Sequence, residues 1–95
     1  MIIAVDFDGT LEKGGKPNTA LIEQLKVQQR RGSTVILWTC REGSRLKEAL
    51  NLLAKSGFAP NLVNRNHPSV VKRMGHDSRK VYADLYIDDK GVKAL

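Results

Sequence analysis

In this 95-residue sequence, two pairs of aspartates have the residue type and the spacing expected of a catalytic or metal-binding site. Asp6 and Asp8 lie two residues apart before Gly9, and Asp88 and Asp89 are adjacent near the other end. Neighbouring carboxylates repel each other, so we expect a cation between them. Hard oxygen ligands suit Mg²⁺, which in turn suits phosphate groups. The four aspartates therefore predict a magnesium site.

The two aspartates of the first pair can take different roles in a phosphoryl transfer. Asp6 can act as a nucleophile that forms an aspartyl-phosphate. Asp8 can protonate the leaving group and later take a proton from water. Gly9 allows a sharp turn that frees backbone N–H groups, so we count Gly9 and Thr10 as phosphate-binding. Taken alone, Asp-x-Asp-Gly is equally typical of a solvated turn or a calcium loop.

These aspartates must be positioned by strands and helices that alternate along the chain. Apolar runs rich in β-branched residues predict strands at 1–5, 34–38, 61–64 and 81–87. Apolar residues at helical spacing, with caps and stop signals, predict helices at 18–31, 43–57 and 67–75, and 13–17 reads as a loop or tight hairpin. This alternation indicates a parallel α/β sheet with right-handed crossovers. We expect about four strands in a single domain over 1–95, since only six residues follow Asp89.

Ligands of such sheets bind beyond the carboxyl ends of the strands. Asp6, Thr39, Asn64 and Asp88 all fall at these ends. Thr39 also precedes a helix start, where a hydroxyl and free N–H groups favour a phosphate. Arg41 and Asn64, in the same loops, are candidates to contact the substrate beyond its phosphate.

Phosphoryl transfer also needs a cation beside the transferring group, and Lys72 and Lys80 are the candidates. Lys80 precedes a predicted strand of seven residues, which places it about 20 Å from that strand's carboxyl end. Lys72 lies in a helix that begins at the active-site edge. We therefore prefer Lys72, and the case for Lys80 becomes stronger if the fourth strand starts later.

The composition sets the class of protein and its partners. There are 16 Lys and Arg against 10 Asp and Glu, a net charge of +6, which favours anionic partners such as small phosphates or nucleic acid, although ordinary solubilising charge explains it equally well. The single cysteine allows no disulfide within the chain and fits a reducing compartment. The apolar run of 1–5 is too short for a signal peptide or a membrane span. We expect a cytoplasmic protein that does not bind a membrane.

Together, these segments resemble the motifs of the haloacid dehalogenase (HAD) superfamily. Asp6-Phe7-Asp8-Gly9-Thr10-Leu11 resembles the first motif, Thr39 in Ile36-Leu37-Trp38-Thr39 the second, and Tyr86-Ile87-Asp88-Asp89 the fourth. The third motif is a lysine, to which Lys72 corresponds. The resemblance spans 1–89. It implies a Rossmannoid fold, a three-layer sandwich, with Mg²⁺ held by the Asp6 side chain, the Asp8 carbonyl and Asp88, and with Asp89 close by.

The chain differs from larger HAD members because it leaves no room for a cap domain. Only seven residues separate Thr10 from Asn18, and the stretch from Thr39 to Asp88 is also too short for one. A capless site implies a large phosphorylated substrate or closure by another subunit, as in a homo-oligomer. The leading hypothesis is a phosphatase. The alternatives are a phosphatase of nucleic-acid or nucleotide ends, a non-catalytic binding module, and dehalogenase or phosphonatase chemistry.

Overall fold

The computed structural model, which describes residues 1–78 and 80–94, is a mixed α/β fold on a mostly parallel sheet. Five strands follow the order β5-β4-β1-β6-β7, and β2 and β3 form a separate hairpin. The strands are β1 (Ile2–Val5), β2 (Glu12–Lys13), β3 (Lys16–Pro17), β4 (Thr34–Leu37), β5 (Leu62–Val63), β6 (Leu85–Asp88) and β7 (Gly91–Ala94). The helices are α1 (Thr19–Arg30), α2 (Gly43–Lys55) and α3 (Pro68–Met74).

The three helices begin and end within a residue or two of the predicted bounds. Asn18 caps α1 through its side chain, which accepts a hydrogen bond from Leu21 N at 3.3 Å. Gly75 ends α3 in the left-handed conformation, with a φ of 82°. No helix in the described part of the chain is both long enough and apolar enough to cross a membrane.

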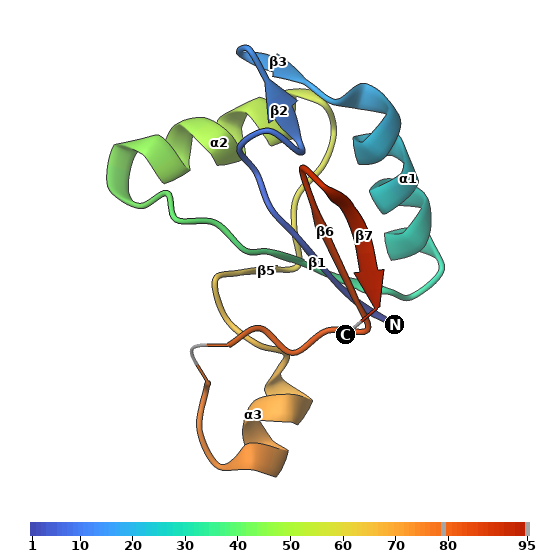
Figure 1. Cartoon of the computed structure of the whole chain (residues 1–95), viewed down its shortest axis with the longest axis vertical. Helices are drawn as coiled ribbons and strands as arrows, with labels where there is room; N and C mark the ends of the chain where they lie inside the picture. The colour runs from blue at the N-terminus through green and yellow to red at the C-terminus, as the bar shows by residue number, and fades with distance from the viewer. Residues whose placement is uncertain (79, 95) are drawn as a thin grey trace.

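Alternation along the strands gives the sheet two different faces. Figure 1 shows α1 and α2 on one side of the sheet and α3 on the other. The first face is fully covered and forms the main core, whose largest buried side chains are Phe7, Leu11, Ile22, Leu25, Leu37 and Leu53. The second face has a much smaller buried cluster of Ala4, Ile36 and Ala83. Around this cluster lie side chains that remain partly exposed: Ile2, Trp38, Leu62, Val81 and Tyr86.

The expectation of four strands was wrong, because a fifth strand follows the second acidic pair. β7 runs antiparallel to β6, and Asp88 pairs with Gly91 across a turn of only two residues. Gly91 adopts a φ of 122°, and Lys90 N donates to Asp88 Oδ1 at 2.9 Å. Such a tight hairpin needs very few residues, which is why the short segment after Asp89 suffices.

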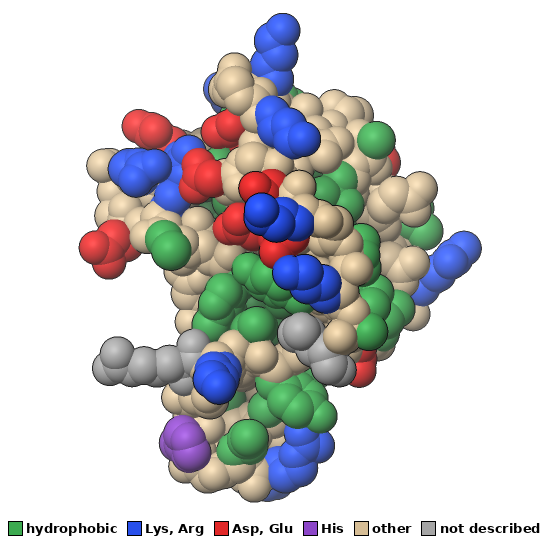
Figure 2. All heavy atoms as spheres, in the orientation of Figure 1, with side chains coloured by type: hydrophobic (Ala, Val, Ile, Leu, Met, Phe, Trp, Pro, Cys, Tyr) green, Lys and Arg blue, Asp and Glu red, His purple; other side chains and the backbone are tan. Residues whose placement is uncertain are grey.

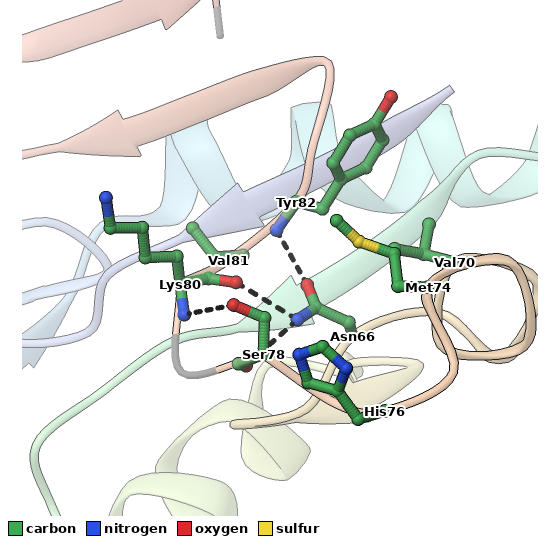
Figure 3. Close-up of a pocket in the computed structure, with 8 residues that line it drawn as sticks. All are labelled: Asn66, Val70, Met74, His76, Ser78, Lys80, Val81 and Tyr82. Carbon is green, nitrogen blue, oxygen red and sulfur yellow. Dashed lines mark hydrogen bonds between the residues drawn. The ribbon is translucent and has the colours of Figure 1, made fainter.

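The fourth predicted strand was also wrong at its start, since β6 begins at Leu85 rather than at Val81. The side chain of buried Asn66 holds the preceding segment instead (Figure 3). Its Nδ2 donates to the carbonyls of Ser78 and Lys80 at 3.3 and 3.1 Å, and its Oδ1 accepts from Tyr82 N at 2.6 Å. Backbone groups bonded to a side chain cannot join a strand ladder, so regular pairing is delayed.

We expect Asn66→Ala to lower the free energy of unfolding by about 2–3 kcal/mol, because it leaves several partly buried polar groups without their partner. Urea denaturation followed by circular dichroism measures this loss. Asn51→Ala, on the exposed surface of α2, is the matched control and should change stability little. A loss no greater than that of the control would show that water replaces the Asn66 contacts.

Candidate active site

The sheet brings Asp6 and Asp88 side by side at the carboxyl ends of adjacent strands. Val5 is in register with both Leu37 and Ile87, and Asp6 N donates to Ile87 O at 2.9 Å. One residue further along, Asp6 therefore lies level with Trp38 on one side and Asp88 on the other. The predicted meeting of these residues at one sheet edge is confirmed.

The turn after Asp6 brings the second acidic pair against the first. Gly9 has a φ of 75°, and a Cβ placed there would lie 3.5 Å from the Cβ of Asp89. However, Gly9 N donates to Glu12 O at 2.8 Å, and Thr10 N donates to Phe7 O at 3.1 Å. The predicted role of these N–H groups as free phosphate donors is therefore wrong in this conformation, since the turn uses both. The Thr10 side chain is buried, and its hydroxyl has no partner within the described residues.

Arg41 binds Asp8 directly, a contact that the sequence did not predict. Its Nη2 lies 2.7 Å from Asp8 Oδ1, and its Nε contacts both carboxylate oxygens at 3.1 and 3.2 Å. The guanidinium also lies 4.7 Å from the centre of the Phe7 ring, and only 13% of the side chain is exposed. These hydrogen bonds lower the pKa of the Asp8 carboxyl. Arg41, predicted to contact substrate, thus orients Asp8.

Asp6 has an electrostatic environment unlike that of Asp8. Partial burial raises the pKa of its carboxyl, although a hydrogen bond from Phe7 N at 2.9 Å opposes this. The negative charges of the other three aspartates raise the pKa further. The Asp6 carboxylate therefore lies close enough to the other three to be repelled by them, as the cation hypothesis requires.

The donor chemistry at this edge fits Mg²⁺, because carboxylate oxygens are its preferred protein ligands. The described side chains nevertheless do not form a preassembled metal site. Among these residues, no three or more His, Cys, Asp or Glu side chains are arranged so that they could hold a metal ion. The Asp8 carboxylate faces Arg41, and Asp88 Oδ2 has Lys93 Nζ at 3.8 Å. Among the described residues, the side chains of Asp6 and Asp89 have no basic partner.

Thr39 and Asn64 meet at the next two strand ends, as predicted. Asn64 Oδ1 accepts from Thr39 N at 2.7 Å, and Thr39 Oγ1 accepts from Arg41 N at 3.1 Å. Asn64 holds a left-handed conformation with a φ of 52°. Glu42, at the N-cap of α2, makes no side-chain hydrogen bond to the helix. Thr39 and Asn64 therefore shape the loop that leads to Arg41 and to the start of α2.

The two candidate lysines lie in the segments around α3. Lys72 lines a hollow beside Arg65 and Asp77. Lys80 lines a cavity of about 270 Å³ between α3 and the segment held by Asn66 (Figure 3). None of the four aspartates lines either space. Because β6 starts at Leu85, strand length no longer excludes Lys80, and the choice between the two lysines stays open.

We expect Asp6→Asn to raise the melting temperature of the metal-free protein by a few degrees at neutral pH. The raised pKa of Asp6 means that its ionised form destabilises the folded state. The increase in melting temperature should therefore be complete above the pKa of Asp6. It should vanish below about pH 4, where the carboxyl is protonated in both the folded and the unfolded state. Thermal unfolding in EDTA across pH measures it. Glu23→Gln, an exposed carboxylate paired with Lys26, is the control.

Two aromatic residues on the second face were not predicted to belong to the site. Trp38 follows β4 level with Asp6, and Tyr86 precedes Asp88 by two residues on β6. Residues two apart in a strand share a face, so the alternation itself was the available signal.

Comparisons with known proteins identify a relative but no activity. No family model and no curated protein matches the chain. A solved structure, described as that of a conserved protein from Bacteroides thetaiotaomicron, matches with a TM-score of 0.80 and 37% sequence identity. The match covers 100% of this chain and 80% of the other. The chain therefore belongs to the same family as this conserved Bacteroides protein.

Proposed function

We propose that this protein is a Mg²⁺-dependent phosphomonoester hydrolase that works through an aspartyl-phosphate on Asp6. The observation that carries the proposal is the position of Asp6, level with Asp88 on the adjacent strand and within the field of all three other aspartates. The spacing of these residues, and their resemblance to HAD motifs, support the same chemistry.

In the proposed reaction, an Asp6 carboxylate oxygen attacks phosphorus and the bond to the ester oxygen breaks. The leaving alcohol takes a proton from Asp8. Water then attacks the aspartyl-phosphate while Asp8 accepts its proton, which releases inorganic phosphate and restores Asp6. Since Arg41 keeps the pKa of Asp8 low and holds its carboxylate, Asp8 must leave this ion pair to serve as the acid.

Asp6, Asp88 and Asp89, together with the backbone of Asp8, would hold the metal in this proposal. When bound, Mg²⁺ would offset the repulsion among the carboxylates and the charge of the phosphoryl group. Thr39, near the open start of α2, would bind the phosphate, and Lys72 or Lys80 would supply the remaining positive charge.

The proposal includes a Rossmannoid three-layer sandwich without a cap. Helices on both sides of the sheet support the layering (Figure 1). The short β2–β3 hairpin occupies the place of a cap after the first motif. A site so open suits a large phosphorylated molecule, including a nucleic-acid end, or a second subunit that closes over the substrate.

Phosphate release from p-nitrophenyl phosphate, measured with Mg²⁺ and with EDTA, tests this function. We expect turnover only when Mg²⁺ is present. The absence of turnover with Mg²⁺ on a broad panel of phosphate esters would favour a non-catalytic binding protein with this fold.

A further inference from the structure

Two partly exposed aromatic side chains, Trp38 and Tyr86, stand beside Asp6 on the second face of the sheet. We call this pair the aromatic shelf. Both pack around the small buried cluster that contains Ala4 and Ile36. Figure 2 shows hydrophobic side chains gathered directly next to the acidic group. Trp38 is level with Asp6, and Tyr86 precedes Asp88 by two residues on β6, so the shelf adjoins the candidate active site.

The register of the strands fixes how the shelf surrounds Asp6. Ile36 and Tyr86 both pair with Ala4, two residues before the row that contains Trp38 and Asp6. Side chains two residues apart share a face, so Asp6 follows Ala4 on the same side as both rings. Trp38 and Tyr86 thus lie on the same face as Asp6, at the two strands that flank β1.

The charges around Asp6 are unevenly distributed. Asp88 and Asp89 occupy the side toward β7, whereas Trp38 occupies the side toward β4. Tyr86 lies near enough that Asp6 and Asp88 raise the pKa of its phenol, although burial is the larger cause. An uncharged group attached to the phosphate is therefore favoured on the shelf over the side that carries the Asp88 and Asp89 carboxylates.

We propose that the aromatic shelf binds a flat aromatic ring carried by the phosphate ester, so that the substrate is an aryl phosphate or a nucleotide. This inference rests on the proposed function, since the phosphate must lie at Asp6. Stacking of one ring on an aromatic side chain is worth about 1–3 kcal/mol, or roughly 5- to 150-fold in affinity.

Trp38 is the single tryptophan of the chain, so the tryptophan fluorescence of the protein reports on this side chain alone. Wild-type protein with Mg²⁺ is titrated with phenylphosphonate and with ethylphosphonate, which carry the same charged group and are not phosphate esters. We expect the phenyl compound to bind at least about fivefold more tightly and to change the Trp38 emission. Equal affinities, or no binding of the phenyl compound, would overturn the inference.

Variants on the same face separate the shelf from general hydrophobicity. Calorimetry should show that Trp38→Leu and Tyr86→Leu each reduce the preference for the phenyl compound. Tyr82→Leu is the matched control, because Tyr82 is 47% exposed and lies under Arg73 in the segment held by Asn66. A preference that survives both shelf substitutions would also overturn the inference.

A third ligand and the turnover assay complete the test. If the phosphonate analogue of adenosine 5′-monophosphate binds at least as tightly as phenylphosphonate, the ring belongs to a nucleotide; weaker binding indicates an aryl ester. Turnover without ring preference would refute the shelf alone. Ring preference without turnover would refute the proposed function and leave the shelf as a binding site.

Discussion

Asp6→Asn should reduce the rate of phosphate release by about a thousandfold or more. An asparagine amide cannot form the aspartyl-phosphate, and removal of a nucleophile generally has effects of this size or larger. The fold should be unaffected, because the amide oxygen can still accept the hydrogen bond from Phe7 N. Initial rates with a saturating aryl phosphate and Mg²⁺ measure the loss.

Two controls make the Asp6 result specific. Glu23→Gln, purified in the same way, should keep full activity because Glu23 lies on α1, where it pairs with Lys26. Mass spectrometry of rapidly quenched wild-type protein should detect one added phosphoryl group, which Asp6→Asn should lack. Activity retained in Asp6→Asn would mean that a different group attacks the phosphate or that another enzyme contaminates the sample.

Phe7→Ala should lower the free energy of unfolding by about 3–5 kcal/mol, the usual cost of truncating a buried phenylalanine. Phe7 is only 1% exposed, and its side chain belongs to the main core beneath α1 and α2. The substitution also removes the ring under Arg41, so the Arg41–Asp8 pair should loosen. Because a small domain has little stability to spare, much of the variant is expected to be unfolded at 37 °C.

Phe7→Leu is the matched variant for this prediction. It preserves an apolar core side chain and removes only the aromatic face, so it should cost clearly less than alanine does. Urea denaturation of both variants gives the comparison. A loss below about 1 kcal/mol in Phe7→Ala would mean that the core rearranges to fill the space.

Local patterns predicted the elements well where nearby residues determine them. The apolar run before Asp6 and the cap at Asn18 depend on neighbours in sequence, and both predictions are confirmed. The start of β6 was missed because Asn66, sixteen residues before Tyr82, supplies the competing hydrogen bonds. No pattern within the strand itself reports such a distant contact.

In the candidate site, too, some features could be predicted from the sequence and others depend on distant contacts. The register of parallel strands follows from alternation, so the approach of Asp6 to Asp88 could be predicted. The Arg41–Asp8 pair spans thirty-three positions and depends on a loop conformation that includes Gly43, with a φ of 59°. Long flexible side chains in such loops have several available partners, and only the folded geometry selects among them.

The β6–β7 hairpin has a consequence for the entropy of ligand binding. Fixing the backbone of a disordered residue costs about 1–2 kcal/mol. Asp88 pairs with Gly91 on β7 and directly follows Ile87, which pairs with Val5 on β1, and Asp89 sits in the two-residue turn between paired strands, against Gly9. This part of the site is thus preorganised, so an incoming cation does not have to order it. Most of the conformational adjustment on binding should then fall on the side chains of Asp8 and Arg41.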